Sequence, residues 1–111
     1  MRASLLLTQA LARMPLVAIL RGVTAPEAGE VGAELVAAGI EVLEVPVNSP
    51  GPYDSIRILR DTLGDSAVVG AGTVVSTRDV EQVSDAGAQI ALAPNTDEAI
   101  IEACLRHGMV P

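Results

Sequence analysis

Short apolar runs alternate with longer amphipathic stretches along almost the whole chain. Each apolar run is bounded by turn-forming residues and has the length and Val, Ile and Leu content of a buried strand, whereas each following stretch repeats its apolar residues at helical spacing. The expected strands are 16–20, 41–47, 67–71 and 89–93, and the expected helices are 25–38, 53–63, 77–85 and 97–106. The pattern therefore predicts four strand–helix units within a single domain, 1–111.

The ends of the expected helices carry capping signals. Thr24 precedes the first of them, with Pro and Glu in its first turn, and Thr77 is the expected cap of the third. Glycines follow the helices at positions 39, 64, 87 and 108. After the last of these glycines, residues 109–111 are expected to begin a fifth strand.

Residues 1–14 predict a short amphipathic N-terminal helix. The stretch superficially resembles a signal peptide, but Thr8 and Gln9 break its apolar run. No stretch of the chain approaches the roughly 18 apolar residues that a membrane span needs, so a membrane partner is not expected.

The composition and the repeat together favour an α/β fold. Half of the residues are hydrophobic and only 1% are aromatic, which suits parallel strands covered by helices. Strands recur every ~18 to 26 residues, the spacing of successive units in a (β/α) barrel. The chain therefore predicts about four βα units and a fifth-strand stub, half of an eight-stranded barrel.

Charge and cysteine content exclude several functions. The net charge of −7 and the single aromatic residue, Tyr53, provide neither a phosphate-binding surface nor a stacking platform for nucleic acid. Cys104 is the only cysteine, which excludes an intramolecular disulfide and a thiolate metal site, and we expect no metal and no cofactor. A lone cysteine in mid-helix is expected to be a core residue in a cytoplasmic protein.

Glu44 is the residue that most needs an explanation. It lies in the middle of the apolar run 41–47, where strand alternation directs Leu43, Val45 and Val47 to one face and Glu44 to the other. A carboxylate buried there costs free energy unless a partner or a function compensates. The competing interpretation is a shifted strand in which Glu44 meets solvent.

The carboxyl ends of the expected strands carry further polar groups, and ligands bind at these ends in parallel α/β folds. Arg21 is either a solvated charge or an anion clamp, and Asn48 and Asn95 are either turn formers or ligand contacts. The run Gly70-Ala71-Gly72-Thr73 invites a dinucleotide interpretation, but Val75 stands where the third glycine is needed. We expect instead a glycine-opened pocket with the Thr73 hydroxyl as a donor.

Four segments together resemble one enzyme family. Residues 16–22 (LVAILRG), 44–50 (EVPVNSP), 70–74 (GAGTV) and 93–95 (APN) are similar to the N-terminal half of the 2-keto-3-deoxy-6-phosphogluconate and 6-phosphogalactonate aldolases. The Asn-Ser-Pro of 48–50 resembles the phosphogalactonate branch. The resemblance implies a homotrimeric (β/α)8 TIM barrel and a class I aldolase that cleaves a phosphorylated keto-deoxy sugar acid into pyruvate and glyceraldehyde 3-phosphate.

The resemblance also implies roles for individual residues. Glu44 matches the general acid/base, Arg21 an arginine near the substrate carboxylate, and Thr73 a pyruvate-binding threonine. The matching motifs add three further substrate-binding candidates: Asn48, Pro94 and Asn95. The family's Schiff-base lysine lies on the sixth strand, and the 111 residues contain no lysine.

Two hypotheses follow. In the first, the chain is the N-terminal half of such an aldolase and is inactive alone. In the second, it is a non-catalytic half-barrel that assembles with another copy or with a C-terminal polypeptide, because its sheet would expose unpaired edges. Another phosphate-binding barrel, such as an epimerase or a thiamin phosphate synthase relative, is a weaker alternative because it gives no reason for Glu44.

Overall fold

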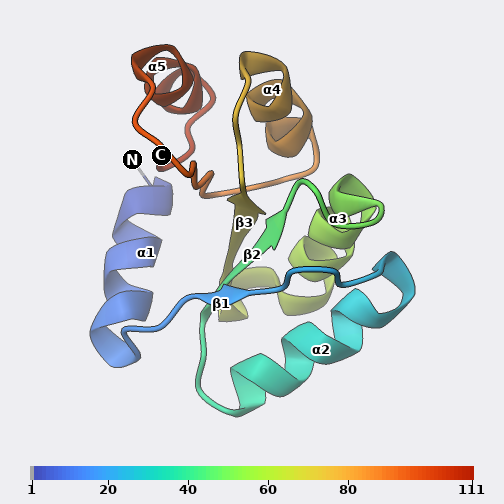
Figure 1. Cartoon of the computed structure of the whole chain (residues 1–111). Helices are drawn as coiled ribbons and strands as arrows, with labels where there is room; N and C mark the ends of the chain where they lie inside the picture. Colours follow the sequence, from blue (N-terminus) through green and yellow to red (C-terminus); the bar gives the residue numbers. More distant parts are fainter. Residues whose placement is uncertain (1) are drawn as a thin grey trace.

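The chain folds as an open, partial barrel of parallel strands with helices packed around it (Figure 1). The structure is a computed structural model and describes residues 2–111. Its elements are α1 (Arg2–Arg13), β1 (Ala18–Ile19), α2 (Ala25–Ala37), β2 (Val42–Pro46), α3 (Pro52–Leu63), the 3-10 turn η1 (Gly64–Ser66), β3 (Val68–Gly72), α4 (Thr77–Asp85) and α5 (Glu98–Arg106). The predicted α/β class and the helix-after-strand order are confirmed. The predicted N-terminal helix is α1, and Met1 lies outside the described residues.

The strands form one parallel sheet in the order β1-β2-β3. Its register sets Glu44 beside Ile19 of β1 on one side and beside Gly70 of β3 on the other. An extended segment continues the sheet beyond β3, because Ala91 pairs with Ala71, and Val110 in turn pairs with Ile90. The fifth-strand stub predicted at 109–111 therefore contributes a single paired residue.

The predicted fourth strand, 89–93, is shorter than expected. Only Ile90 and Ala91 form bridges, although backbone hydrogen bonds continue on both sides, from Leu92 to Ala71 at 2.8 Å and from Ala91 to Val110 at 2.9 Å. Strand pairing stops where the chain turns at Pro94, which has no N–H to donate.

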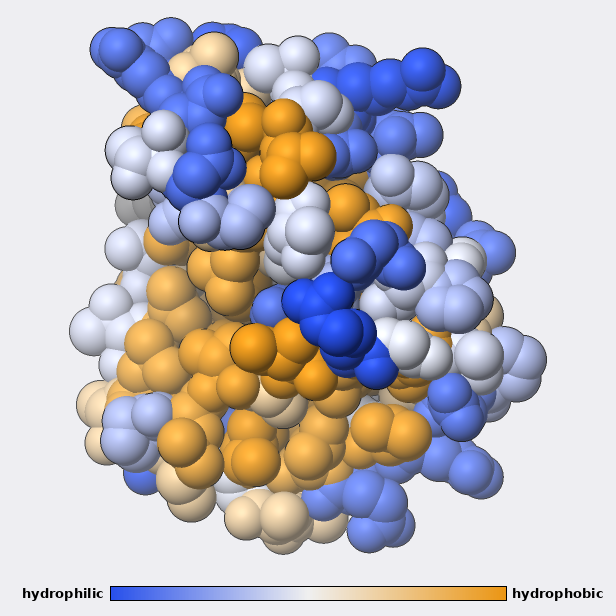
Figure 2. Space-filling model, viewed as in Figure 1, coloured by the Kyte–Doolittle hydropathy of each residue, from blue (hydrophilic) through white to orange (hydrophobic). Residues whose placement is uncertain are grey.

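The prediction of a buried first strand at 16–20 was confirmed only in part: Leu20 is buried in the main core, and its N–H donates to the Glu44 carbonyl at 2.9 Å. Only Ala18 and Ile19 pair with β2, and the side chains of Leu16, Val17 and Ile19 are exposed. Their apolar pattern indicated burial, but Leu16 and Val17 precede the paired residues, and Ile19 pairs with Glu44 and so faces away from the main core, on the edge strand of the described sheet. Figure 2 shows apolar side chains gathered over α1 and this edge.

The two faces of the sheet bury different clusters. On the outer face, Leu43, Val45 and Val69 pack with Ile56 and Leu59 of α3 in the main core. On the other face, a smaller cluster forms where Ala10 of α1 covers the amino ends of the strands; it comprises Ala10, Val42, Val68 and Ile90. The alternation predicted for 41–47 is confirmed, and it directs Glu44 to the face on which this second cluster lies.

Helix caps fix where the loops turn into helices. The Thr24 N–H donates to the Glu27 carboxylate at 2.8 Å, as in a capping box, so the predicted start of α2 is confirmed. The expected cap at Thr77 was wrong, because Ser76 has extended dihedral angles and its Oγ accepts a hydrogen bond from the Asp79 N–H at 3.0 Å. No helix within residues 2–111 is long and apolar enough to cross a membrane.

Candidate active site

The candidate site lies at the carboxyl ends of the strands, where polar residues from three loops meet. β2 supplies Glu44 and the turn after it Asn48, the loop after β1 supplies Arg21, and the end of β3 supplies Gly72 and Thr73. Parallel pairing aligns these ends at one edge of the sheet, so residues 21, 44, 48 and 73 are brought together by register rather than by sequence proximity.

Glu44 is a buried carboxylate without a hydrogen-bond partner for one of its oxygens. The residue is 5% exposed, and its Oε2 atom is buried and unpaired. The alternative in which Glu44 faces solvent was therefore wrong. Such an atom loses its hydration without a replacement, a cost of about 1–3 kcal/mol or more for a charged group. We therefore expect this carboxylate to have a function that compensates for its cost in stability.

Gly72 makes the space that Glu44 occupies. Glu44 pairs with Gly70 in the register, but its side chain leans toward the end of β3, where a Cβ atom on Gly72 would overlap the carboxylate. Gly70 serves a different neighbour, because a Cβ atom there would overlap the backbone carbonyl of Ile90. A glycine-opened space thus exists at Gly72, but a protein carboxylate fills it, and the pocket with the Thr73 hydroxyl as a donor stays a prediction.

Burial raises the pKa of the Glu44 carboxyl above its ordinary value of 4.5, and the positive charge of Arg21 opposes part of that rise. Desolvation is the larger influence because the charged form loses water. A carboxyl group whose pKa moves toward neutrality is suited to give and take protons.

Arg21 and Asn48 are in direct contact. The Arg21 Nη1 atom donates a hydrogen bond to Asn48 Oδ1 at 3.1 Å, and both side chains reach solvent. Next to this pair, the Gly22 N–H donates to Ser49 Oγ at 3.1 Å. The loops after β1 and β2 are therefore joined by two hydrogen bonds between successive residues. Asn48 does more than form a turn, since it orients the guanidinium.

Thr73 has an unfavourable backbone conformation. Its φ is 59°, the only positive value among non-glycine residues of the described chain. A β-branched residue in this left-handed region costs of order 1–3 kcal/mol, and such strain concentrates at functional sites. The half-buried Thr73 directly follows the glycine that makes room for Glu44.

Pro94 and Asn95 lie apart from this cluster. Both are exposed in the turn that follows the extended segment next to β3. Within residues 2–111, no hydrogen bond joins the Asn95 side chain to Glu44, Arg21 or Thr73. They share the carboxyl edge of the sheet without contributing to its buried part.

Sequence reasoning assigned no role to Ser49. Its buried hydroxyl, in a residue 6% exposed, joins two loops that are far apart in the sequence, and only its place directly after a strand could have drawn attention to it. Cys104 was predicted to be a core residue, which its complete burial confirms. That burial raises the pKa of its thiol, so the neutral form is favoured.

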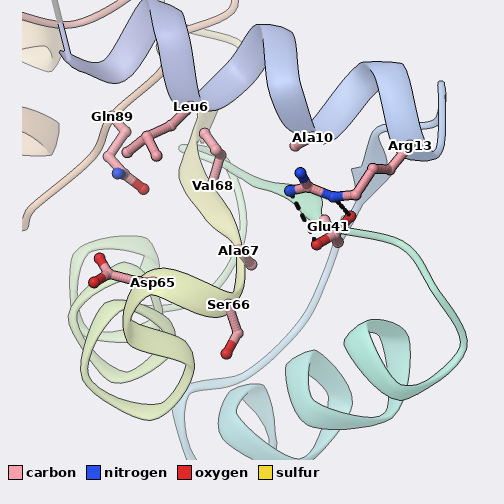
Figure 3. Close-up of a pocket in the computed structure, with 9 residues that line it drawn as sticks. All are labelled: Leu6, Ala10, Arg13, Glu41, Asp65, Ser66, Ala67, Val68 and Gln89. Carbon is pink, nitrogen blue, oxygen red and sulfur yellow. Dashed lines mark hydrogen bonds and ion pairs between the residues drawn. The ribbon is translucent and has the colours of Figure 1, made fainter.

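A hollow lies at the opposite, amino end of the strands (Figure 3). Arg13 and Glu41 face each other across it with hydrogen bonds of 2.8 and 3.3 Å, and Leu6, Ala10 and Gln89 line the rest. Arg13 and Glu41 pair with each other, Asp65 lies 3.9 Å from the Arg2 guanidinium, and Gln89 Oε1 accepts a hydrogen bond from the Val69 N–H. We therefore infer that the residues around this hollow stabilise the fold. Within residues 2–111, no three His, Cys, Asp or Glu side chains are grouped to hold a metal ion.

A partial barrel of parallel strands, with a buried acid and a nearby arginine at its carboxyl edge, defines a (β/α)-barrel protein with a candidate site at that edge. The comparison with protein families identifies the family of barrel proteins. Residues 7–110 match the family model for KDPG and KHG aldolase, so the chain belongs to the KDPG/KHG aldolase family.

Individual relatives agree with this family. The 2-dehydro-3-deoxy-6-phosphogalactonate aldolase of Escherichia coli is 40% identical over 98 residues, which cover 87% of this chain and 47% of that protein. The native KDPGal structure is 40% identical with a TM-score of 0.81, covering 87% of this chain and 47% of that one. KDPG aldolase from Legionella pneumophila, solved with pyruvate captured as a covalent carbinolamine intermediate, is 27% identical with a TM-score of 0.77, covering 91% and 48%. The chain thus spans about half the length of the relatives it matches.

Replacing Glu44 with a neutral isostere is expected to stabilise the fold. Because burial raises the Glu44 pKa, this carboxyl favours folding most below pH 4.5, and that contribution is lost as the pH rises through the raised value. Glu44→Gln should not lose this stability as the pH rises. In urea unfolding followed from pH 4 to 8, its free energy of unfolding at pH 7 should exceed the wild-type value by about 0.5–2 kcal/mol. Glu41→Gln, which breaks the Arg13 ion pair, should give no gain. A Glu44→Gln variant less stable than the wild type at pH 7 would indicate a paired carboxylate.

The fit between Gly72 and Glu44 predicts a strong coupling between the two positions. Gly72→Ala should destabilise the chain by about 1–3 kcal/mol, since its new methyl group overlaps the carboxylate. In a Glu44→Ala background the same change should cost less, with a coupling energy above about 1 kcal/mol in a double-mutant cycle. Additive costs, within about 0.5 kcal/mol, would contradict the assignment.

Proposed function

We propose that the chain provides the acid–base half of a Schiff-base aldolase site that acts on 2-dehydro-3-deoxy-6-phosphogalactonate. The observation that carries the proposal is the buried, unpaired Glu44 carboxylate in the space left by Gly72. Family membership and the similarity to the Escherichia coli phosphogalactonate enzyme support this choice of substrate. The homotrimeric assembly implied by the resemblance and the cytoplasmic location expected from the lone cysteine remain part of the proposal.

In this proposal Glu44 moves protons while the keto group of the substrate is converted into an imine. Imine formation requires a proton for the departing hydroxyl group. Carbon–carbon cleavage requires a base for the substrate hydroxyl on the carbon that becomes the aldehyde, while the electron pair of the broken bond passes into the imine. A single carboxyl with a raised pKa can serve both steps, because it gives up a proton in the first step and accepts one in the second.

The surrounding residues act on the substrate anion. Arg21, held by Asn48, presents a guanidinium suited to the carboxylate of a keto acid. The strained Thr73 contributes a hydroxyl to the pyruvate part, and Pro94 and Asn95 form the neighbouring rim. The amine for the imine must come from elsewhere, since none of the 111 residues is lysine, and we infer that the chain alone does not form the adduct.

A chimera tests this proposal. In it, the matched residues of this chain replace the corresponding part of the Escherichia coli relative. The chimera should release pyruvate from 2-dehydro-3-deoxy-6-phosphogalactonate and form a borohydride-stable adduct with pyruvate, whereas the chain alone should form none. Glu44→Gln should lower kcat by about 10²–10⁴-fold.

The matched control is Glu41→Gln. Glu41 lies three residues before Glu44, just ahead of the amino end of β2, and its replacement should retain the activity of the chimera. A chimera whose kcat survives Glu44→Gln would contradict the role of Glu44. An adduct on the chain alone would contradict the inference that it is inactive.

A second candidate function is that of a half-barrel module that associates through its open edge. The exposed Leu16, Val17 and Ile19 on and before the edge strand favour it, since such edges pair with other chains. The partner is then another copy or a C-terminal polypeptide that completes the barrel.

Sedimentation of the purified chain separates this candidate from a self-sufficient monomer. We expect the chain to self-associate at micromolar concentration. Ile19→Lys should raise the dissociation constant at least about tenfold, equivalent to about 1.4 kcal/mol. Leu105→Lys places the same charge on an exposed leucine of α5 and should leave association unchanged. A well-folded, monodisperse monomer would exclude self-association.

A further inference from the structure

Two adjacent hydrogen bonds clamp the loop after β1 to the loop after β2. Arg21 donates to Asn48 through their side chains, and the Gly22 N–H donates to Ser49 Oγ, each at 3.1 Å and across 27 positions of sequence. The two bonds differ in environment: Asn48 is exposed, whereas Ser49 is 6% exposed. An exposed side-chain pair contributes little by itself, so we attribute closure of the clamp mainly to the part-buried bond of Ser49.

Ser49 is itself rigidly held. Its N–H donates to the Pro46 carbonyl at 2.9 Å, which fixes the turn directly at the end of β2. Its hydroxyl receives the N–H of Gly22, whose φ of +81° is a left-handed conformation that glycine adopts without strain. Without that hydroxyl, a partly buried N–H would lack an acceptor, and the exposed Arg21–Asn48 pair would be left to join the turn at Gly22 to the loop after β2.

Arg21 sits directly between two fixed points. On its amino side, the Leu20 N–H donates to the Glu44 carbonyl at 2.9 Å, and on its carboxyl side Gly22 is tied to Ser49. The guanidinium lies close enough to Glu44 for its charge to lower the pKa of that carboxyl against the effect of burial. Burial and Arg21 are the two influences acting on this pKa within residues 2–111.

We propose that Ser49 is a positioning residue: by accepting the Gly22 N–H, it fixes the backbone at residues 21–22 and so keeps the Arg21 guanidinium beside the Glu44 carboxylate. This inference rests on the proposed function in one respect: it takes Glu44 to be the acid–base group. It accounts for a buried hydroxyl whose hydrogen bond goes to Gly22 rather than to Glu44 or Arg21.

The test measures the coupling itself. Glutamate side chains of the chain are labelled with ¹³C, the Glu44 signal is assigned by its absence in Glu44→Gln, and its pKa is obtained by NMR titration. Arg21→Leu should raise the Glu44 pKa, because the opposing charge is removed. Ser49→Ala should raise it most of the way to the Arg21→Leu value, and should add nothing in the Arg21→Leu background. Ser49→Thr, which retains the hydroxyl, should restore the wild-type value.

A purely structural Ser49 gives a different result. Ser49→Ala would then lower the stability of the chain while the Glu44 pKa stays at its wild-type value, and this outcome overturns the proposal. If Ser49→Ala does not fold, Ser49→Cys fills the same site with a weaker acceptor and should give an intermediate rise; an unchanged pKa again overturns it. The titration needs no turnover, so an inactive chimera with an intact Ser49 effect would refute the aldolase proposal alone.

Discussion

The fit of the Glu44 carboxylate into the space left by Gly72 is the constraint around which this half-barrel is built. It requires a glycine at the carboxyl end of β3, the register that sets β3 beside β2, and a strand phase that directs Leu43 and Val45 into the helical layer. Each of these features alone is ordinary. Together they hold a charged group out of water with one oxygen unpaired, an arrangement that stability does not favour and that proton transfer can use.

The two ends of the sheet serve different purposes. At the amino ends, α1 covers a small apolar cluster, and Arg13 pairs with Glu41, so charges there are neutralised. At the carboxyl ends, strain and unpaired groups accumulate: Thr73 has a left-handed backbone, and Glu44 lacks a partner. This division follows from parallel strands, whose carboxyl ends all open into the loops that lead to the helices.

Local signals were sufficient where one segment decided the outcome. The helices of α2 to α5 and the phase of β2 followed from periodicity and glycine stops, because side-chain spacing and backbone freedom are properties of the segment itself. The burial of the whole of 16–20 did not follow, since an apolar run shows only that a strand would gain from burial. Whether it is covered depends on its neighbours, and Ile19 faces away from the main core on the edge strand of the described sheet.

The sequence by itself determined the α/β class, the acid in mid-strand, and the order of motifs that resembles the aldolase family. It also placed Arg21, Asn48 and Thr73 at strand ends. Only the tertiary structure decided that Gly72 houses the carboxylate, that Asn48 holds Arg21, and that Ser49 ties two loops together. Each of these contacts joins residues more than 25 positions apart, and the register of the parallel strands, which no local pattern encodes, sets which of them meet.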